Sequence, residues 1–272
     1  MKIQYSDDHI TVFESALYRT TSTLVAINDT LLIVDPNWLP DEIEFIKTFI
    51  EQHYNTHQQY LLFTHSDYDH IIGYGAFPNA KVIASDAFVQ NNNKDIILNQ
   101  ITTFDNTYYI ERTYPIAYPN VSHLIKHDGT TLSIGGFEMD FHLAPGHCAD
   151  AIFIIIPGIG CWIAGDYLSN IEIPLIDDDF QSYQITLNKA AQIFEKYPVH
   201  KLITGHGDIA MTRREIQARI NNDIQYLNLL HTYQDGEIND EITNHILSYS
   251  QNPFMIQAHK QNISNVFNGV RQ

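Results

Sequence analysis

Four apolar runs of strand length in this chain each end abruptly in a cluster of residues that can bind metal ions. The end of a strand holds side chains rigidly and leaves them open to a cleft, which a metal site requires. The clusters together offer four imidazoles and three carboxylates, a mixture suited to one or two divalent cations such as zinc, manganese or iron. The clusters are His65-Ser66-Asp67-Tyr68-Asp69-His70, Pro145-Gly146-His147, Gly165-Asp166 and Thr204-Gly205-His206-Gly207.

The apolar pattern between these clusters predicts two rounds of strands, each closed by a helix, followed by a helical tail. Short β-branched runs and period-two alternation predict strands, while apolar residues that recur every three or four positions predict helices. The predicted strands cover residues 10–13, 23–27, 31–34, 60–64, 81–84, 132–134, 137–143, 152–156, 161–164 and 201–204. The predicted helices begin at Pro40, cover 183–197 and continue from Met211 onward.

This order predicts α and β layers packed as one unit. We expect residues 1–210 to form the main αβ domain, with the helices of 211–272 packed on it. Residues 88–125 have no clean period, and we interpret them as an excursion or lid. No repeat, low-complexity tract or linker is evident.

The composition limits the classes of function. With 272 residues, 44% hydrophobic, the chain is long enough to bury a substantial core. A net charge of −17, from 15 basic and 32 acidic residues, argues against a nucleic-acid or anionic membrane partner. The acidic N-terminus does not resemble a signal peptide, so we expect a cytoplasmic protein with a small-molecule substrate and reduced Cys148 and Cys161.

The order and spacing of the four clusters resemble those of the metallo-β-lactamase-fold hydrolases, over about residues 10 to 210. That family carries His-x-His-x-Asp-His, then Pro-Gly-His, Gly-Asp and Gly-His-Gly. The resemblance implies an α/β fold, a four-layer αββα sandwich with two metal ions at the edge between its sheets. It assigns His65, Asp67 and His147 to one ion, Asp69, His70 and His206 to the other, and Asp166 as a bridge.

The chain departs from this family pattern at Asp67, where the second histidine of the motif would stand. A carboxylate can still bind a cation, but it is a harder ligand than imidazole and favours manganese or iron somewhat more. We expect two divalent ions, zinc first, with manganese and iron as alternatives. The extra carboxylate makes the loaded site formally neutral, from which we infer a weaker attraction for strongly anionic substrates.

The resemblance implies a hydrolase in which a metal-bridging hydroxide attacks an ester, thioester, lactone or phosphodiester. Asp69 or Asp166 would orient the hydroxide. The size and the Gly-Asp motif favour a glyoxalase II or lactonase-like branch over the true β-lactamases, which lack the bridging Asp. Lactonases, however, place a tyrosine a few residues after that Asp, whereas Tyr167 is adjacent to it here. No motif identifies the substrate or the oligomeric state.

Two other functions remain open from the sequence. Persulfide dioxygenases of this superfamily are mononuclear iron enzymes that use the equivalents of His65, His147 and Asp166. A ligand-binding protein on the same fold is the third hypothesis. We interpret Cys148 as a buried inert thiol pointing away from the metals, and residues 177–179 as a solvated surface run.

Overall fold

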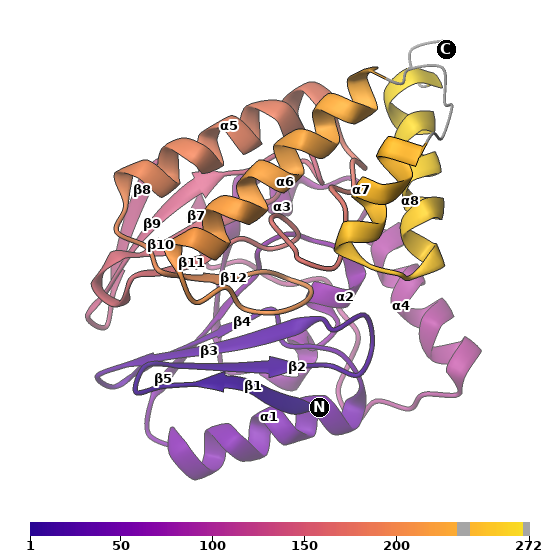
Figure 1. The fold of residues 1–272 in the computed structure, drawn as a ribbon. Helices are drawn as coiled ribbons and strands as arrows, with labels where there is room; N and C mark the ends of the chain where they lie inside the picture. The colour runs from indigo at the N-terminus through magenta and orange to yellow at the C-terminus, as the bar shows by residue number, and fades with distance from the viewer. Residues whose placement is uncertain (233–239, 269–272) are drawn as a thin grey trace.

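The computed structural model describes residues 1–232 and 240–268. Two β-sheets stack face to face, and helices cover the outer face of each sheet (Figure 1). The predicted fold class, an αββα sandwich with C-terminal helices, is therefore confirmed. The expected tail from Met211 includes residues 233–239 and 269–272, which lie outside the described residues.

The first sheet has seven strands in sequence order, antiparallel from β1 to β4 and parallel from β4 to β7. Its strands are β1 (Lys2–Ser6), β2 (Ile10–Glu14), β3 (Thr21–Ile27), β4 (Thr30–Val34), β5 (Gln58–Leu62), β6 (Lys81–Ser85) and β7 (His123–Ile125). Parallel strands need crossover connections, and α1 (Pro40–His53) supplies the one between β4 and β5. Its Ile43, Ile46 and Ile50 are buried.

The second sheet has the strand order β12-β11-β10-β9-β8 and is antiparallel except between β11 and β12. Its strands are β8 (Thr130–Ile134), β9 (Phe137–Leu143), β10 (Ile152–Ile156), β11 (Cys161–Ile163) and β12 (Lys201–Ile203). Apolar residues of both sheets form one core cluster, among them Val12, Phe141 and Ile154. This shared core explains the period-two pattern in the sequence, because one face of each strand points into it.

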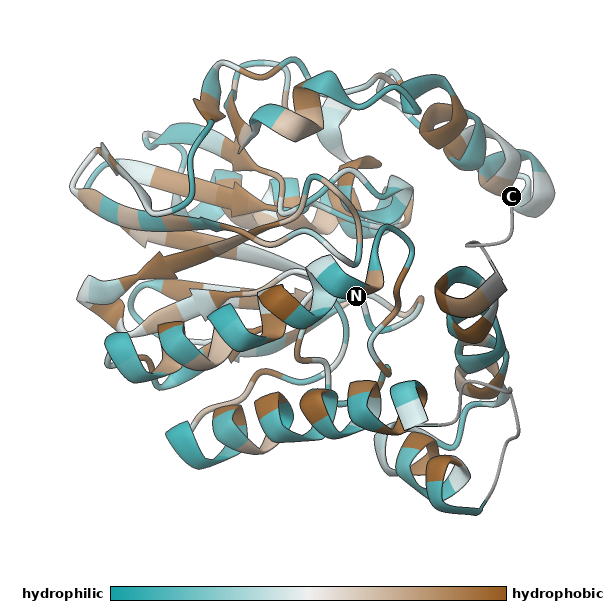
Figure 2. Cartoon of the chain, turned by 90° about the horizontal axis from the view of Figure 1, so that it is seen from above, coloured by the Kyte–Doolittle hydropathy of each residue, from teal (hydrophilic) through white to brown (hydrophobic). Residues whose placement is uncertain are grey.

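The remaining helices range from four to twenty residues, and the two longest lie over the second sheet (Figure 1). They are α2 (Tyr68–Ile71), α3 (Asp86–Gln90), α4 (Lys94–Tyr108), α5 (Phe180–Lys196), α6 (Arg213–Thr232), α7 (Asp240–Tyr249) and α8 (Pro253–Ile263). Single turns occur at Tyr74–Ala76, Pro157–Ile159 and Ser264–Asn268. Figure 2 shows hydrophobic and hydrophilic residues alternating along the helices, as expected for helices with one buried side. Within the described ranges, no helix is long and apolar enough to span a bilayer.

The segment 88–125, expected to be irregular, contains the four-turn helix α4. Only Ile97 and Ile101 of this helix are buried, so its apolar stripe is too narrow to give a clear period. Helix α5 begins at Phe180, three residues before the predicted start, because the Asp179 side chain accepts a hydrogen bond from the Ser182 backbone N–H (2.6 Å).

Helix α6 joins the C-terminal helices to the loop that follows β11. The buried Asp223 carboxylate accepts hydrogen bonds from the Tyr249 hydroxyl of α7 (2.8 Å) and the Leu168 backbone N–H (3.2 Å). Apolar residues of α5, α6, α7 and α8 belong to one core cluster. The division of the chain at residue 210 stays a prediction.

Candidate metal centre

The four polar clusters of the sequence lie together at one edge of the sandwich. His65 follows β5, and Asp69 and His70 lie in the short helix α2, to which Asp67 is the N-cap. His147 lies in the loop from β9 to β10, while Asp166 and His206 follow β11 and β12. Within the described part of the chain, potential ligand atoms approach to within 4.8 Å of one another in two groups that contain all seven residues. We call His65, Asp67, His147 and Asp166 site one, and Asp69, His70 and His206 site two.

The Asp166 carboxylate lies between the two sites and is close to all four imidazoles. Its oxygens lie 3.5 Å from Nε2 of His65, 3.2 Å from Nε2 of His70, 3.5 Å from Nε2 of His147 and 3.4 Å from Nε2 of His206. Two ligand atoms about 2.1 Å from a tetrahedral cation lie about 3.4 Å apart. The spacing around Asp166 therefore fits ligands of shared cations.

The other two carboxylates each approach histidines of one site. Asp67 Oδ2 lies 3.2 Å from His147 Nε2 and 3.6 Å from His65 Nε2. Asp69 Oδ2 lies 3.4 Å from His206 Nε2 and 3.6 Å from the Nε2 of its neighbour His70. Asp67 Oδ2 thus lies close enough to both histidines of site one to share a cation with them.

Each of the four imidazoles is oriented by a partner on its other ring nitrogen. The Nδ1 atoms contact oxygen atoms that accept a hydrogen bond, which places the lone pair on Nε2. The partners are Thr64 Oγ1 for His65 (2.9 Å), Asp35 Oδ2 for His70 (3.0 Å), the Leu175 carbonyl for His147 (2.9 Å) and the Tyr18 carbonyl for His206 (3.1 Å).

Several polar atoms at the centre are buried without a hydrogen-bond partner in the described structure. They are the Nε2 atoms of His65, His70 and His147, and Oδ1 of Asp166. A buried polar atom without a partner costs free energy, and such atoms are rare in native proteins. These atoms have no hydrogen-bond partner, and each of them can bind a divalent cation once the imidazoles lose a proton, so the residues present fit a metal centre.

Without a cation, the closeness of the imidazoles and carboxylates determines which of these groups hold protons. Burial lowers the pKa of His65, but the carboxylates of Asp166 and Asp67 outweigh burial and raise it to about 10. The same balance raises the pKa of His147 to about 9. Burial favours the neutral form of Asp166, yet the surrounding imidazoles hold its pKa well below the usual range. Metal binding would replace these protons, so it would release protons to solvent.

Two glycines allow the clusters to approach so closely. A Cβ atom on Gly205 would lie 1.9 Å from Asp166 Oδ1 and 2.8 Å from His70 Cε1, which no side chain can satisfy. Gly146 has φ of +129°, and its Cβ would lie 2.4 Å from the Tyr183 backbone. Glycine at these positions is therefore a requirement of the site and of the turn before His147.

Sequence reasoning missed two carboxylates behind the imidazoles. Asp35 directly follows β4, so the same strand-end pattern that identified the other clusters could have found it. Glu172 Oε1 lies 3.8 Å from His206 Nδ1. Burial raises the pKa of Glu172 to about 7, although His206 opposes the shift. No motif surrounds Glu172 that could have indicated it.

A cavity of about 560 Å³ opens beside site one. Asp67 and Cys148 line it together with carboxamides of the segment 90–93. The run 177–179 is exposed, as predicted, and two of its carboxylates also line this cavity. The side chains around it that the structure describes include no lysine or arginine.

The predicted direction of Cys148 is wrong. The prediction assumed a continuing strand, but β9 ends at Leu143, and the loop turns the thiol toward the site. Its Sγ lies within 4.8 Å of ring nitrogens of His65 and His147. Burial, with the neighbouring Asp150 and Asp67, raises the pKa of this thiol well above its usual range.

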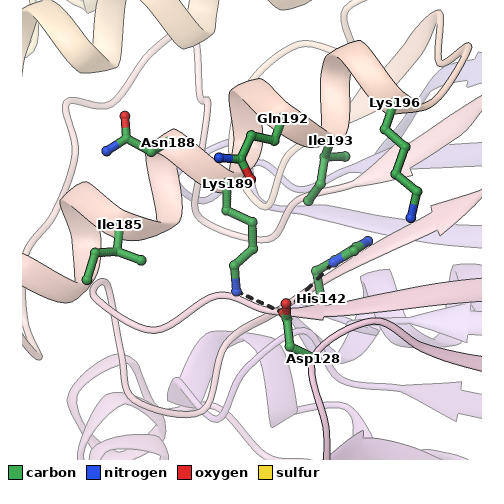
Figure 3. A pocket seen from close by; sticks show the side chains of 8 residues that line it. All are labelled: Asp128, His142, Ile185, Asn188, Lys189, Gln192, Ile193 and Lys196. Carbon is green, nitrogen blue, oxygen red and sulfur yellow. Dashed lines mark hydrogen bonds and ion pairs between the residues drawn. The ribbon is translucent and has the colours of Figure 1, made fainter.

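A second hollow of about 330 Å³ lies between α5 and β9 and contains none of the seven residues (Figure 3). His142 lines it, and its Nε2 lies 3.4 Å from the Tyr197 hydroxyl. Lys189 points across the hollow to Asp128, with 2.8 Å between Nζ and Oδ1. These groups pair with one another, so this hollow is not the candidate active site.

Comparison with known proteins places this arrangement in a family. A sequence model described as the Metallo-beta-lactamase superfamily matches residues 17–206, and the chain belongs to that superfamily. The matched range contains all seven residues of the two sites. No curated protein sequence matches the chain.

Solved structures share the fold at low identity. The stereoselective inverting sec-alkylsulfatase Pisa1 from Pseudomonas sp. matches with a TM-score of 0.70 and 15% identity, over 96% of this chain and 49% of the sulfatase. This chain thus spans about half of the sulfatase. A metallo-beta-lactamase family protein from Thermus thermophilus matches with a TM-score of 0.63 and 14% identity, over 94% of this chain and 93% of that protein. The BLEG-1 B3 metallo-beta-lactamase matches with a TM-score of 0.58 and 17% identity, over 77% of this chain and 96% of the lactamase.

Proposed function

We propose that this protein is a metal-dependent hydrolase of a small-molecule ester, thioester, lactone or phosphodiester, with two divalent cations at sites one and two. The observation that carries the proposal is the arrangement of four imidazoles, each with its Nε2 facing the single carboxylate of Asp166. We infer zinc as the first cation to test, then manganese and iron, because imidazole and carboxylate ligands suit all three.

The cations would activate water at neutral pH and polarise the oxygen of the scissile group. The protein's own contribution is to hold the ligands and the attacking water. Asp166 would bridge the two sites. Asp69, whose carboxylate lies at the edge of site two, would accept a hydrogen bond from the water and orient it. Both carboxylates are nearly buried, with side chains 6% and 12% exposed, so bulk water competes little with them.

The size and Asp166 support a relation to the glyoxalase II and lactonase-like branch. A role for Tyr167 at the substrate, as in lactonases, has less support. Its side chain is buried, and its hydroxyl accepts the His147 backbone N–H (2.9 Å) and lies 3.0 Å from the Ala144 carbonyl. Tyr167 therefore shapes the loop that carries His147.

The iron-oxygenase alternative would need only His65, His147 and Asp166. Site two argues for the hydrolase, since Asp69, His70 and His206 are all buried and form as compact a group as site one. Three buried polar side chains facing one another are costly without a cation. The amount of metal per chain distinguishes the two functions.

Elemental analysis of protein purified without chelator or a nickel column tests the proposal. We expect about two equivalents of zinc or manganese per chain. About one equivalent of iron would favour the oxygenase. No metal after reconstitution would contradict both and favour a ligand-binding protein.

Turnover of chromogenic ester, thioester, lactone and phosphodiester probes tests the reaction. His147→Ala and Asp166→Ala should abolish turnover of whichever probe is hydrolysed, with a circular dichroism spectrum that remains native. His142→Ala is the matched control, because it removes an imidazole outside both sites. Retained turnover in either ligand variant would refute the assignment.

A further inference from the structure

Cys148 brings a third kind of donor atom to site one. Its Sγ forms a compact group with ring nitrogens of His65 and His147, all within 4.8 Å. This group shares its two histidines with the group that contains Asp67 and Asp166. The Nε2 atoms of both histidines are buried without a hydrogen-bond partner. The thiol therefore belongs to a group of potential metal ligands in which two atoms, Nε2 of His65 and Nε2 of His147, have no hydrogen-bond partner.

The loop holds the thiol in this position. Cys148 Sγ donates a hydrogen bond to Asp150 Oδ1 (3.2 Å). The same carboxylate accepts the Ser66 backbone N–H (3.3 Å) and the Asn91 side-chain amide (3.4 Å). Asp150 thus ties the thiol to the segment that carries the ligands of the first cluster.

We propose that Cys148 is an alternative ligand of site one, which takes a soft cation with His65, His147 and the Cys148 thiolate, and a hard cation with Asp67 and Asp166 in place of the thiolate. The inference rests on the proposed metal centre. Thiolates select soft cations such as cadmium, whereas carboxylates select hard ones such as manganese. The chain has a carboxylate where its family has an imidazole, and the thiol supplies a soft donor beside the same two histidines.

The ligand exchange is balanced without any oxidant. The S–H bond breaks, a bond from sulfur to the cation forms, and the proton passes to Asp150 Oδ1, which already accepts the thiol hydrogen bond, and then to solvent. Cys148 also lines the 560 Å³ cavity, so reagents can reach the free thiol when a hard cation occupies the site.

Absorption spectra of the full chain loaded with Co²⁺ or Cd²⁺ test the proposal. Thiolate coordination gives a charge-transfer band in the ultraviolet, which imidazole and carboxylate ligands do not give. We expect the band in the wild-type protein and in Cys161→Ser, and its loss in Cys148→Ser. Cys161 is the matched control, because it is buried in β11. The affinity of Cys148→Ser for Cd²⁺ should fall about tenfold or more, and its affinity for Mn²⁺ should not change.

Alkylation of the wild-type protein gives a second readout that needs no variant. In alkaline solution, where part of the thiol is ionised, Cd²⁺ should slow the reaction of Cys148 with iodoacetamide several-fold, and Mn²⁺ should leave its rate unchanged. Bound Co²⁺ or Cd²⁺ without the band, or a band that persists in Cys148→Ser, would overturn the proposal while the metal centre stands. Failure of every cation to bind would refute the metal centre itself, and this inference with it.

Discussion

Asp35 supports ligands of both sites, so Asp35→Asn should weaken metal binding without touching a ligand. The Asp35 carboxylate accepts hydrogen bonds from His70 Nδ1 (3.0 Å), Thr64 Oγ1 (2.6 Å) and the Thr64 backbone N–H (2.9 Å). The Thr64 hydroxyl in turn contacts His65 Nδ1 (2.9 Å). An asparagine keeps the shape but loses the charge, and one of its two terminal atoms can only donate.

The magnitude follows from these contacts. A hydrogen bond to a charged group contributes about 1.5–3 kcal/mol, and loss of a partner behind a metal ligand typically weakens binding about 10–100-fold. We expect a loss of about 2 kcal/mol, or about 30-fold in the dissociation constant for zinc. Thr64→Val should have a smaller effect, because it removes the contacts of the hydroxyl to His65 and Asp35 but leaves the hydrogen bond from His70 Nδ1 to the charged Asp35 carboxylate in place.

Competition with a chromogenic chelator for zinc measures both affinities in metal-free protein. The exposed Asp95 of α4 supplies the control Asp95→Asn, which should bind zinc like the wild type. A dissociation constant of Asp35→Asn within about twofold of wild type would refute the reasoning, as would an equal loss in the control. Thermal unfolding of the metal-free variants separates a binding defect from a folding defect.

Three further predictions follow from other parts of the structure. Gly205→Ala should abolish metal binding, because its Cβ would displace Asp166; a normal metal content by elemental analysis would contradict this. Burial raises the pKa of Asp223 from 3.8 to about 7, although Tyr249 opposes the shift. The carboxyl group of Asp223 therefore ionises at a lower pH in the unfolded chain than in the folded chain. Because of this group, the free energy of unfolding should fall as pH rises from about 4 to about 7, by at most about 4 kcal/mol. The unfolding free energy of Asp223→Asn should lack this dependence on pH, which denaturant unfolding at several pH values measures. A pH profile of the variant parallel to that of the wild type would refute the reasoning. Asp67→His should lower KM for an anionic substrate more than for its neutral analogue, and equal changes would exclude an effect of charge.

The strand pattern of the two sheets could be predicted because both sheets bury one face in a shared core. Residues 152–156 are apolar throughout since β10 lies at the centre of its sheet and is buried on both faces. Helix α4 escaped prediction because only two of its side chains are buried. Strand β1 is an edge strand, mostly exposed, so it has little apolar signal.

The seven residues of the two sites could be selected from the sequence because their order matches a family pattern. Their orienting partners could not be found in the same way. Leu175 and Tyr18 act through backbone carbonyls, which no side-chain pattern encodes. The direction of Cys148 depended on where β9 ends, and a strand boundary is the least certain part of any sequence-based assignment.

The position of the two sites between the sheets has a mechanical consequence. Site one takes His65 from the first-sheet half of the chain and His147 from the second, and site two likewise joins His70 to His206. A cation bound as proposed would act as a clamp between the halves. At a hundred times its dissociation constant, each cation would add about 2.7 kcal/mol to the free energy of unfolding. Neither half alone holds a complete ligand set. The concentration of free cation would therefore determine how strongly the two halves are held together.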